Sequence, residues 1–311
     1  MTEMSQSSMK KRLLKYHKIY EQIYENPSIP LYQITKKTGI SRSSVSRYLM
    51  EMYENAILKG PMAFLKPSHT GQRYASFCVF DDPLSVYHRL NRFPLIVSRT
   101  LCSGRWNITI ICGRSLNFSV LKGFRQCVVQ GPKGLTHLPK VPFLEWDAAL
   151  ETIYSTLSTP RTQSTLYEQI PAIPWKPDEW TLYHRFKYNT RMQAVSILKS
   201  CSIRYEQYQK WNRELPTYTS IQCAFYPHGI ERYFFLDFLF ESQYHRQLVA
   251  ILGSLPATSI FFSVGRYLLA RVPILNRKEN DDLFALLFHL EEKGYFSSFF
   301  QSMVISTSQR V

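Results

Sequence analysis

Two arginines and several serines lie close together in the chain, in a pattern suited to nucleic-acid contact. Arg42, Ser43, Ser46 and Arg47 share one face if residues 42–53 are helical, since residues three or four apart are neighbours on a helix. Guanidinium groups bind phosphates and guanine edges, and short hydroxyl side chains permit close approach to DNA. This stretch therefore predicts a recognition helix for the major groove. The alternative is an ordinary helical hairpin with a solvated, serine-rich face.

The surrounding residues predict the elements that would position this helix. Gly39 permits the left-handed backbone that ends a preceding helix over residues 31–38, and Ser41 is a good N-cap for the next. Val45, Leu49 and Met52 recur at spacings of four and three, which indicates a buried face. A helix over residues 10–26 precedes this pair and a wing-like strand over 57–67 follows it. Together they predict a winged helix-turn-helix.

Further lysines and serines extend the surface expected to contact DNA. Lys36, Lys37 and Lys59 would contact the phosphate backbone, while Ser41 would cap the helix and touch phosphate. The complete set expected to bind DNA is Lys36, Lys37, Ser41, Arg42, Ser43, Ser44, Ser46, Arg47 and Lys59.

The charge distribution favours a polyanionic partner. The formal net charge is +15, and residues 1–143 carry 21 Lys and Arg against seven acids, whereas residues 144–311 carry 17 against 16. The excess thus lies beside the predicted DNA-binding unit. A generally basic proteome is the alternative explanation.

Membrane, secreted and metal-binding classes are not expected. The longest apolar run, 249–274, contains Pro256, Arg266 and Arg271, and the N-terminus lacks the apolar core of a signal peptide. The six cysteines include no CxxC pair, which argues against a zinc site or a disulfide framework. We expect a cytoplasmic protein without a metal.

The remaining chain predicts an α+β fold. Residues 72–139 follow the order β-α-β-β-α-β of a ferredoxin-like domain, with helices over 83–93 and 116–126 and a turn at residues 131–134. A proline-rich connector follows, and the plan then recurs. Ala63-Phe64 recurs as Ala224-Phe225, and Tyr87-His88-Arg89 as Tyr244-His245-Arg246, at offsets of 161 and 157 residues.

We therefore expect an internal duplication of two winged helix-turn-helix domains, each followed by a ferredoxin-like domain. The boundaries are a winged helix-turn-helix at 10–67, a ferredoxin-like domain at 71–143, a connector at 144–177, a degenerate winged helix-turn-helix at 178–227 and a second ferredoxin-like domain at 230–308.

This organisation resembles the leucine-responsive regulatory protein/AsnC family of transcription regulators. Asp178, Leu182, Asn189 and Arg191 sit as in the first helix and turn of that family. The resemblance implies a regulator of double-stranded DNA whose sheets pair, here as an intramolecular pseudo-dimer. It leaves open whether this pseudo-dimer assembles into a larger homo-oligomer. A small-molecule effector would then bind near two β-turns, formed by Gly104, Arg105 and Trp106 and by Gly265, Arg266 and Tyr267.

The two heads are expected to be unequal. Ser202-Ile203-Arg204 replaces Gly39-Ile40-Ser41, and Tyr208 and Asn212 replace the buried Val45 and Leu49. Arg204, Gln207 and Lys210 remain able to touch phosphate. DNA is therefore expected to be read mainly by the first head.

Catalytic motifs are missing from the sequence: there is no HExxH, no GxSxG and no phosphate-binding glycine loop. We therefore expect no enzyme activity and no cofactor. One enzyme class is kept as an alternative, because siroheme decarboxylases resemble the same regulator fold and bind an anionic tetrapyrrole with arginines and histidines. The first α/β domain is rich in arginine: Arg73, Arg89, Arg92, Arg99, Arg105 and Arg114. A third alternative is an interaction scaffold that does not bind DNA.

Overall fold

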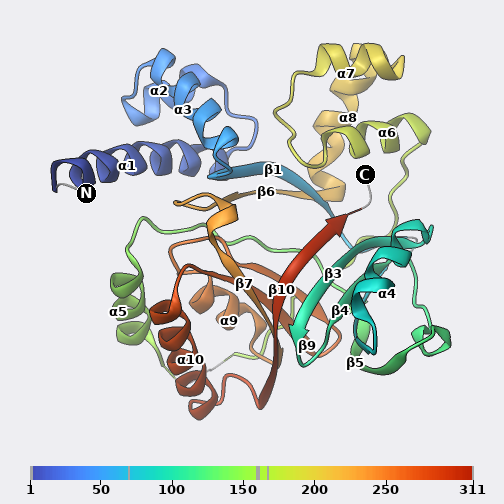
Figure 1. The fold of residues 1–311 in the computed structure, drawn as a ribbon. Helices are drawn as coiled ribbons and strands as arrows, with labels where there is room; N and C mark the ends of the chain where they lie inside the picture. Colours follow the sequence, from blue (N-terminus) through green and yellow to red (C-terminus); the bar gives the residue numbers. More distant parts are fainter. Residues whose placement is uncertain (1–2, 69–70, 159–161, 167, 310–311) are drawn as a thin grey trace.

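The computed structural model describes residues 3–68, 71–158, 162–166 and 168–309. The chain is a mixed α+β protein with two helical heads above a closed antiparallel barrel (Figure 1). Both heads lie at the same end of the barrel, and a two-stranded sheet runs between them and the barrel (Figure 1). Within the described ranges, no helix is long and apolar enough to cross a membrane.

The first head is a winged helix-turn-helix built from α1 (Glu3–Glu25), α2 (Leu31–Thr38) and α3 (Arg42–Glu54). Its core holds Ile19, Ile23, Ile34, Val45 and Met52, none of them more than 1% exposed. These residues recur at helical spacing in the sequence, and burying each fully stabilises the fold by roughly 1.5–3 kcal/mol. Helix α1 begins earlier than expected, at Glu3.

The second head has the same three-helix order, with α6 (Pro177–Phe186), α7 (Ala194–Cys201) and α8 (Tyr205–Tyr218). Its core is more aromatic, because Trp175, Phe186 and Trp211 fill it. The connector expected at 144–177 contains helix α5 (Trp146–Thr156), and it includes residues 159–161 and 167, which lie outside the described residues.

The wing strands of the two heads pair with each other. Strand β1 (Leu58–Leu65) runs antiparallel to β6 (Thr219–Phe225), from the pair Leu58 and Phe225 to the pair Leu65 and Thr219. Arg191 of the second head also donates from Nη1 to the carbonyl oxygens of Pro27 and Ile29, at 3.0 and 2.8 Å. The two heads are therefore held together by the backbone ladder of β1 and β6 and by side-chain hydrogen bonds from Arg191 to backbone carbonyls.

The barrel has eight strands in the order β10-β3-β4-β2-β5-β8-β9-β7. Four come from residues 73–133 and four from residues 234–309. They are β2 (Arg73–Phe80), β3 (Ile96–Gly104), β4 (Ile108–Cys112), β5 (Phe124–Lys133), β7 (Phe234–Glu241), β8 (Ile260–Val264), β9 (Tyr267–Ile274) and β10 (Ser298–Gln309). The two sets join edge to edge, at β10–β3 and at β5–β8.

Alternation along the strands separates the outer cores from the lumen. Phe238 and Phe261 face the layer of α5, α9 (His245–Leu252) and α10 (Arg277–Glu292), whereas their neighbours Leu239 and Phe262 pack inside with Trp106. Helix α4 (Pro83–Arg89) and the 3-10 turn η1 (Leu90–Arg92) cover the other strands. Period-two side-chain alternation therefore supplies two apolar layers from one set of strands.

Two local expectations differ from the structure. In place of the helix expected over 116–126 there is a single 3-10 turn, η2 (Phe118–Val120), because Gly123 adopts a φ of 79° and strand β5 begins at Phe124 and pairs with β2. The turn expected at 131–134 is the end of strand β5. His245 of α9 is fully buried, and its Nδ1 accepts a hydrogen bond from the backbone N–H of Leu166.

Candidate nucleic-acid interface and the adjoining cavity

Helix α3 is positioned by local signals in the sequence. Gly39 ends α2 with a φ of 70°, and Ser41 Oγ then accepts a hydrogen bond from the backbone N–H of Ser44 at 3.3 Å. Val45 and Met52 anchor the opposite face, with no exposed surface at all. The cap and the buried face together fix which side of the helix is turned outward.

The structure brings most of the expected DNA-contacting residues to one surface. Arg42, Ser43, Ser46 and Arg47 are exposed on α3, beside exposed Ser41 and half-buried Ser44. Lys36 and Lys37 are exposed in the last turn of α2. Lys59 is not part of this surface, because it is half-buried on β1 and lines a cavity below the heads.

A carboxylate on the same helix is held against α1. Arg12 Nη2 and the hydroxyl of Tyr16 each lie 2.6 Å from Oε2 of Glu51. These hydrogen bonds, that of Tyr16 first, lower the pKa of Glu51. Arg47 Nε lies 3.9 Å from the other Glu51 oxygen, and the Arg47 guanidinium lies over the ring of Tyr48. Arg47 is therefore partly oriented and partly neutralised before any DNA contact.

The sequence interpretation overlooked the lysines of α1. Lys11, Lys15 and Lys18 are exposed, and Lys15 Nζ lies 6.0 Å from the ring centre of Tyr48 on α3. Their spacing of three and four residues is the signal that could have found them, since it places them along one side of the helix.

The corresponding surface of the second head is differently equipped. Ser202 occupies the left-handed position of the turn with a φ of 55°, and Arg204 provides no side-chain cap for α8. Gln207 donates to Asp178 at 2.8 Å, and Tyr205 is 52% exposed. A Cβ-bearing residue and a missing cap make this turn less favourable than that of the first head.

Neither of the two turns expected near an effector lines the cavity that lies between the wing strands and the barrel. Trp106 is fully buried and donates from Nε1 to Thr109, and exposed Arg105 lies over the ring of Phe300. Exposed Arg266 pairs with Glu241 at 3.1 Å. None of Gly104, Arg105, Trp106, Gly265, Arg266 and Tyr267 lines that cavity.

A cavity of about 530 Å³ lies between the wing strands and one end of the barrel. Its walls come from both halves of the chain, and its basic lining residues are Lys59, Arg73, Lys133, Lys187 and Arg271. Of these, the sequence singles out Lys59 for contact with the DNA backbone and Arg73 as one of the arginines that would bind an anionic tetrapyrrole.

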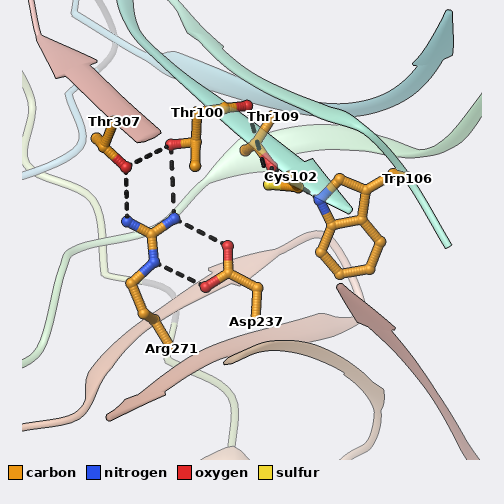
Figure 2. Close-up of polar contacts among 7 residues, drawn as sticks. All are labelled: Thr100, Cys102, Trp106, Thr109, Asp237, Arg271 and Thr307. Carbon is orange, nitrogen blue, oxygen red and sulfur yellow. Dashed lines mark hydrogen bonds and ion pairs between the residues drawn. The ribbon is translucent and has the colours of Figure 1, made fainter. Parts of the chain in front are cut away.

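Arg271 is held by the buried carboxylate of Asp237. Its Nε and Nη2 lie 2.7 and 2.8 Å from the two Asp237 oxygens (Figure 2). Thr100 also accepts from Nη2, and Thr307 accepts from Nη1. Burial opposes the charge of Arg271, but Asp237 outweighs burial and raises the pKa of the guanidinium. This bidentate pair therefore carries no net charge into the cavity.

Comparison with known proteins bears on the first head and on the overall fold. A family model described as winged helix-turn-helix DNA-binding matches residues 17–55. No curated protein matches the chain in sequence. The crystal structure of the siroheme decarboxylase NirDL is similar over 96% of this chain and 93% of that chain, with a TM-score of 0.53 and 11% identity. The same protein in complex with an iron-uroporphyrin III analogue aligns with a TM-score of 0.48 and 10% identity.

The expectation that the chain is not an enzyme is thereby corrected. The chain shares its fold over 96% of its length with a siroheme decarboxylase, which is an enzyme. Missing HExxH, GxSxG and glycine-loop motifs excluded only the activities that use those motifs. The chain thus combines a winged helix-turn-helix DNA-binding unit with a fold that also occurs in a decarboxylase.

Proposed function

We propose that the chain is a sequence-specific DNA-binding regulator of transcription that reads duplex DNA mainly through α3 of its first head. The observation that carries this proposal is the outward face of α3, where Arg42, Ser43, Ser46 and Arg47 are all exposed. Such a face offers donors for guanine and phosphate without bulky side chains that would keep the helix out of the groove. A role on DNA also agrees with the cytoplasmic location expected from the sequence.

The flanking lysines support a backbone-contacting role. Lys36 and Lys37 lie at the end of α2, where the helix enters the turn before α3, and Lys15 and Lys18 are exposed on α1. Each lysine that neutralises a phosphate releases a counterion on binding, and it therefore makes the affinity fall more steeply as salt increases.

We infer that the two halves act as an intramolecular pseudo-dimer with unequal heads, built as in the leucine-responsive regulatory protein/AsnC family. The pairing of β1 with β6 holds the heads in a fixed relation, as the two heads of a dimeric regulator are held for their half-sites. The uncapped α8 and the engaged Gln207 support the assignment of the second head as the weaker one.

The test is selection of bound sites from a random pool of duplexes, followed by binding measurements on a recovered site. Arg42→Ala/Arg47→Ala should weaken binding at moderate salt by about tenfold or more and change the preferred sequence, at roughly 1–3 kcal/mol per base-reading arginine. The matched control is Arg204→Ala/Lys210→Ala, which removes the same charge from the second head and should mainly reduce the salt dependence. Equal effects of the two double variants would refute the assignment of the reading surface.

A siroheme decarboxylase-like activity is the second candidate, and the observation that favours it is the fold match over 96% of the chain. Purified protein should then take up siroheme with a Soret band and release carbon dioxide from it. Titration without a spectral change, under conditions in which the protein is folded, would remove this candidate and leave the DNA-binding proposal untouched.

A further inference from the structure

The cavity between the wing strands and the barrel has the composition of a ligand site. Its roof is formed by residues of β1 and β6, and its floor by residues at one end of the barrel strands. A volume of about 530 Å³ falls within the range of roughly 300–1,000 Å³ typical of small-molecule sites. The apolar part of the lining includes Met62, Phe64, Ile111, Leu138, Tyr226, Ile260, Phe262 and Leu269.

The polar part of the lining is cationic. Lys59, Arg73, Lys133 and Lys187 come from four separate segments of the chain and converge on the cavity. Among the lining residues that the structure describes, none is acidic. Arg271 also lines the wall, but its charge is compensated from behind by Asp237. Cations gathered in a partly desolvated space repel one another, which is costly unless an anion joins them.

Lys133 shows this cost most directly. Its Nζ donates to the carbonyl oxygen of Gly134 at 3.0 Å and to Thr136 Oγ1 at 2.8 Å, and lies 4.4 Å from the ring centre of Phe262. Burial, and then the charge of Arg73, lowers the pKa of Lys133 to about 7. Burial followed by Arg73 also lowers the pKa of Lys187. The two groups thus gain most from an anion that restores the charged form.

We propose that this cavity binds an organic anion whose apolar body packs on Phe262 and the neighbouring aliphatic side chains, while its acidic group meets Lys133 and Arg73. The acidic group is a carboxylate, a phosphate or a sulfonate, and the competition experiment below distinguishes these three. The proposal does not rest on DNA binding, since all of the residues involved lie outside the outward face of α3. The site also differs from the two effector turns implied by the family resemblance.

Two probes with the same aromatic body separate charge from apolar contact. The first is 8-anilinonaphthalene-1-sulfonate, and the second is N-phenyl-1-naphthylamine, which lacks the sulfonate. Fluorescence titration of the full chain should show saturable binding of the sulfonate, about tenfold tighter than that of the neutral probe. Lys133→Met should weaken the sulfonate about tenfold and leave the neutral probe unchanged.

Controls keep the outcome interpretable. Lys122→Met removes an exposed lysine outside the cavity and should leave both titrations unchanged. Arg73→Met provides a second cavity variant should Lys133→Met fail to fold, and it should show the same selective loss.

Lauric acid and dodecyl phosphate should each displace the sulfonate, and the order of their affinities identifies the preferred acidic group. Equal affinity of the two probes for the wild-type chain, or unchanged sulfonate affinity in both folded cavity variants, would overturn the proposal.

Discussion

Substitution of Lys133 by methionine should remove a pH dependence from the stability of the folded chain. In the folded state, burial and the charge of Arg73 lower the pKa of Lys133 to about 7, whereas the ordinary value is 10.5. Between these two values the unfolded chain binds a proton that the folded chain has released. The contribution of Lys133 to the free energy of unfolding therefore increases as pH increases from 7 toward 10.5, because the unfolded state binds more protons at this site throughout that window.

The size of the effect follows from the same two values. Each pH unit inside the window contributes up to about 1.4 kcal/mol, and the contribution is about half of that at pH 7, where the folded group is half protonated. From pH 7 to pH 9, Lys133 should therefore add roughly 2 kcal/mol to the free energy of unfolding. Methionine retains most of the length of the side chain but cannot titrate, so the variant should lack this increase.

Urea unfolding of both proteins at pH 7, 8 and 9 measures the difference. Other groups that titrate in this range, among them the cysteines whose pKa is raised by burial, are present in both proteins and cancel in the comparison. Lys122→Met, which changes an exposed lysine, should keep the wild-type profile. Parallel pH profiles for the wild-type chain and Lys133→Met would show that Lys133 is not desolvated, and the electrostatic reasoning about the cavity would then be wrong.

Two further substitutions test the buried pair and the recognition helix. Asp237→Asn should lower the free energy of unfolding, measured in urea, by about 3 kcal/mol, because it leaves Arg271 in the barrel without its carboxylate. Adding Arg271→Met should recover most of that loss. An Asp237→Asn protein as stable as the wild type would contradict this. Glu51→Gln removes a negative charge 3.9 Å from Arg47 and should tighten binding to a duplex about threefold to fivefold at low salt, as measured by fluorescence anisotropy. Unchanged or weaker DNA binding by a folded Glu51→Gln protein would mean that Arg47 is not at the DNA surface.

The elements that the sequence predicted well are those specified by neighbouring residues. Gly39, Ser41 and the spacing of Val45, Leu49 and Met52 each act within one helical turn, and the first head has the expected helices and cap. The strand pair around Gly265 was likewise predictable, because a glycine between two apolar stretches sets both the turn and the pairing.

The helix expected over residues 116–126 failed for the complementary reason. The apolar residues of that stretch are compatible with a helix, but its last three residues belong to strand β5, which begins at Phe124 and pairs with β2. Pairing with an existing strand outweighed a weak local preference, as tertiary context commonly does.

The cavity could not have been predicted from any one stretch. Lys133 appeared in the sequence as part of a glycine- and proline-rich turn, yet it ends a barrel strand, and its surroundings come from the wing strands, β2 and β8. Edge-to-edge closure at β10–β3 and β5–β8 joins residues that are far apart in the chain. Arg73 and Lys133 lie opposite each other on β2 and β5. Lys59 lies on β1 and Lys187 follows α6, so the four cationic side chains come together only where the wing strands and the second head meet the barrel.

The cavity and the recognition helix are connected through a short path of the chain. Helix α3 ends at Glu54, strand β1 begins at Leu58, and Lys59, Met62 and Phe64 of that strand line the cavity. Because β1 is also paired with β6 along its length, a ligand that pressed on the roof would move both heads together. Such a ligand would alter DNA binding only if it contacted β1 more favourably in one head position than in another.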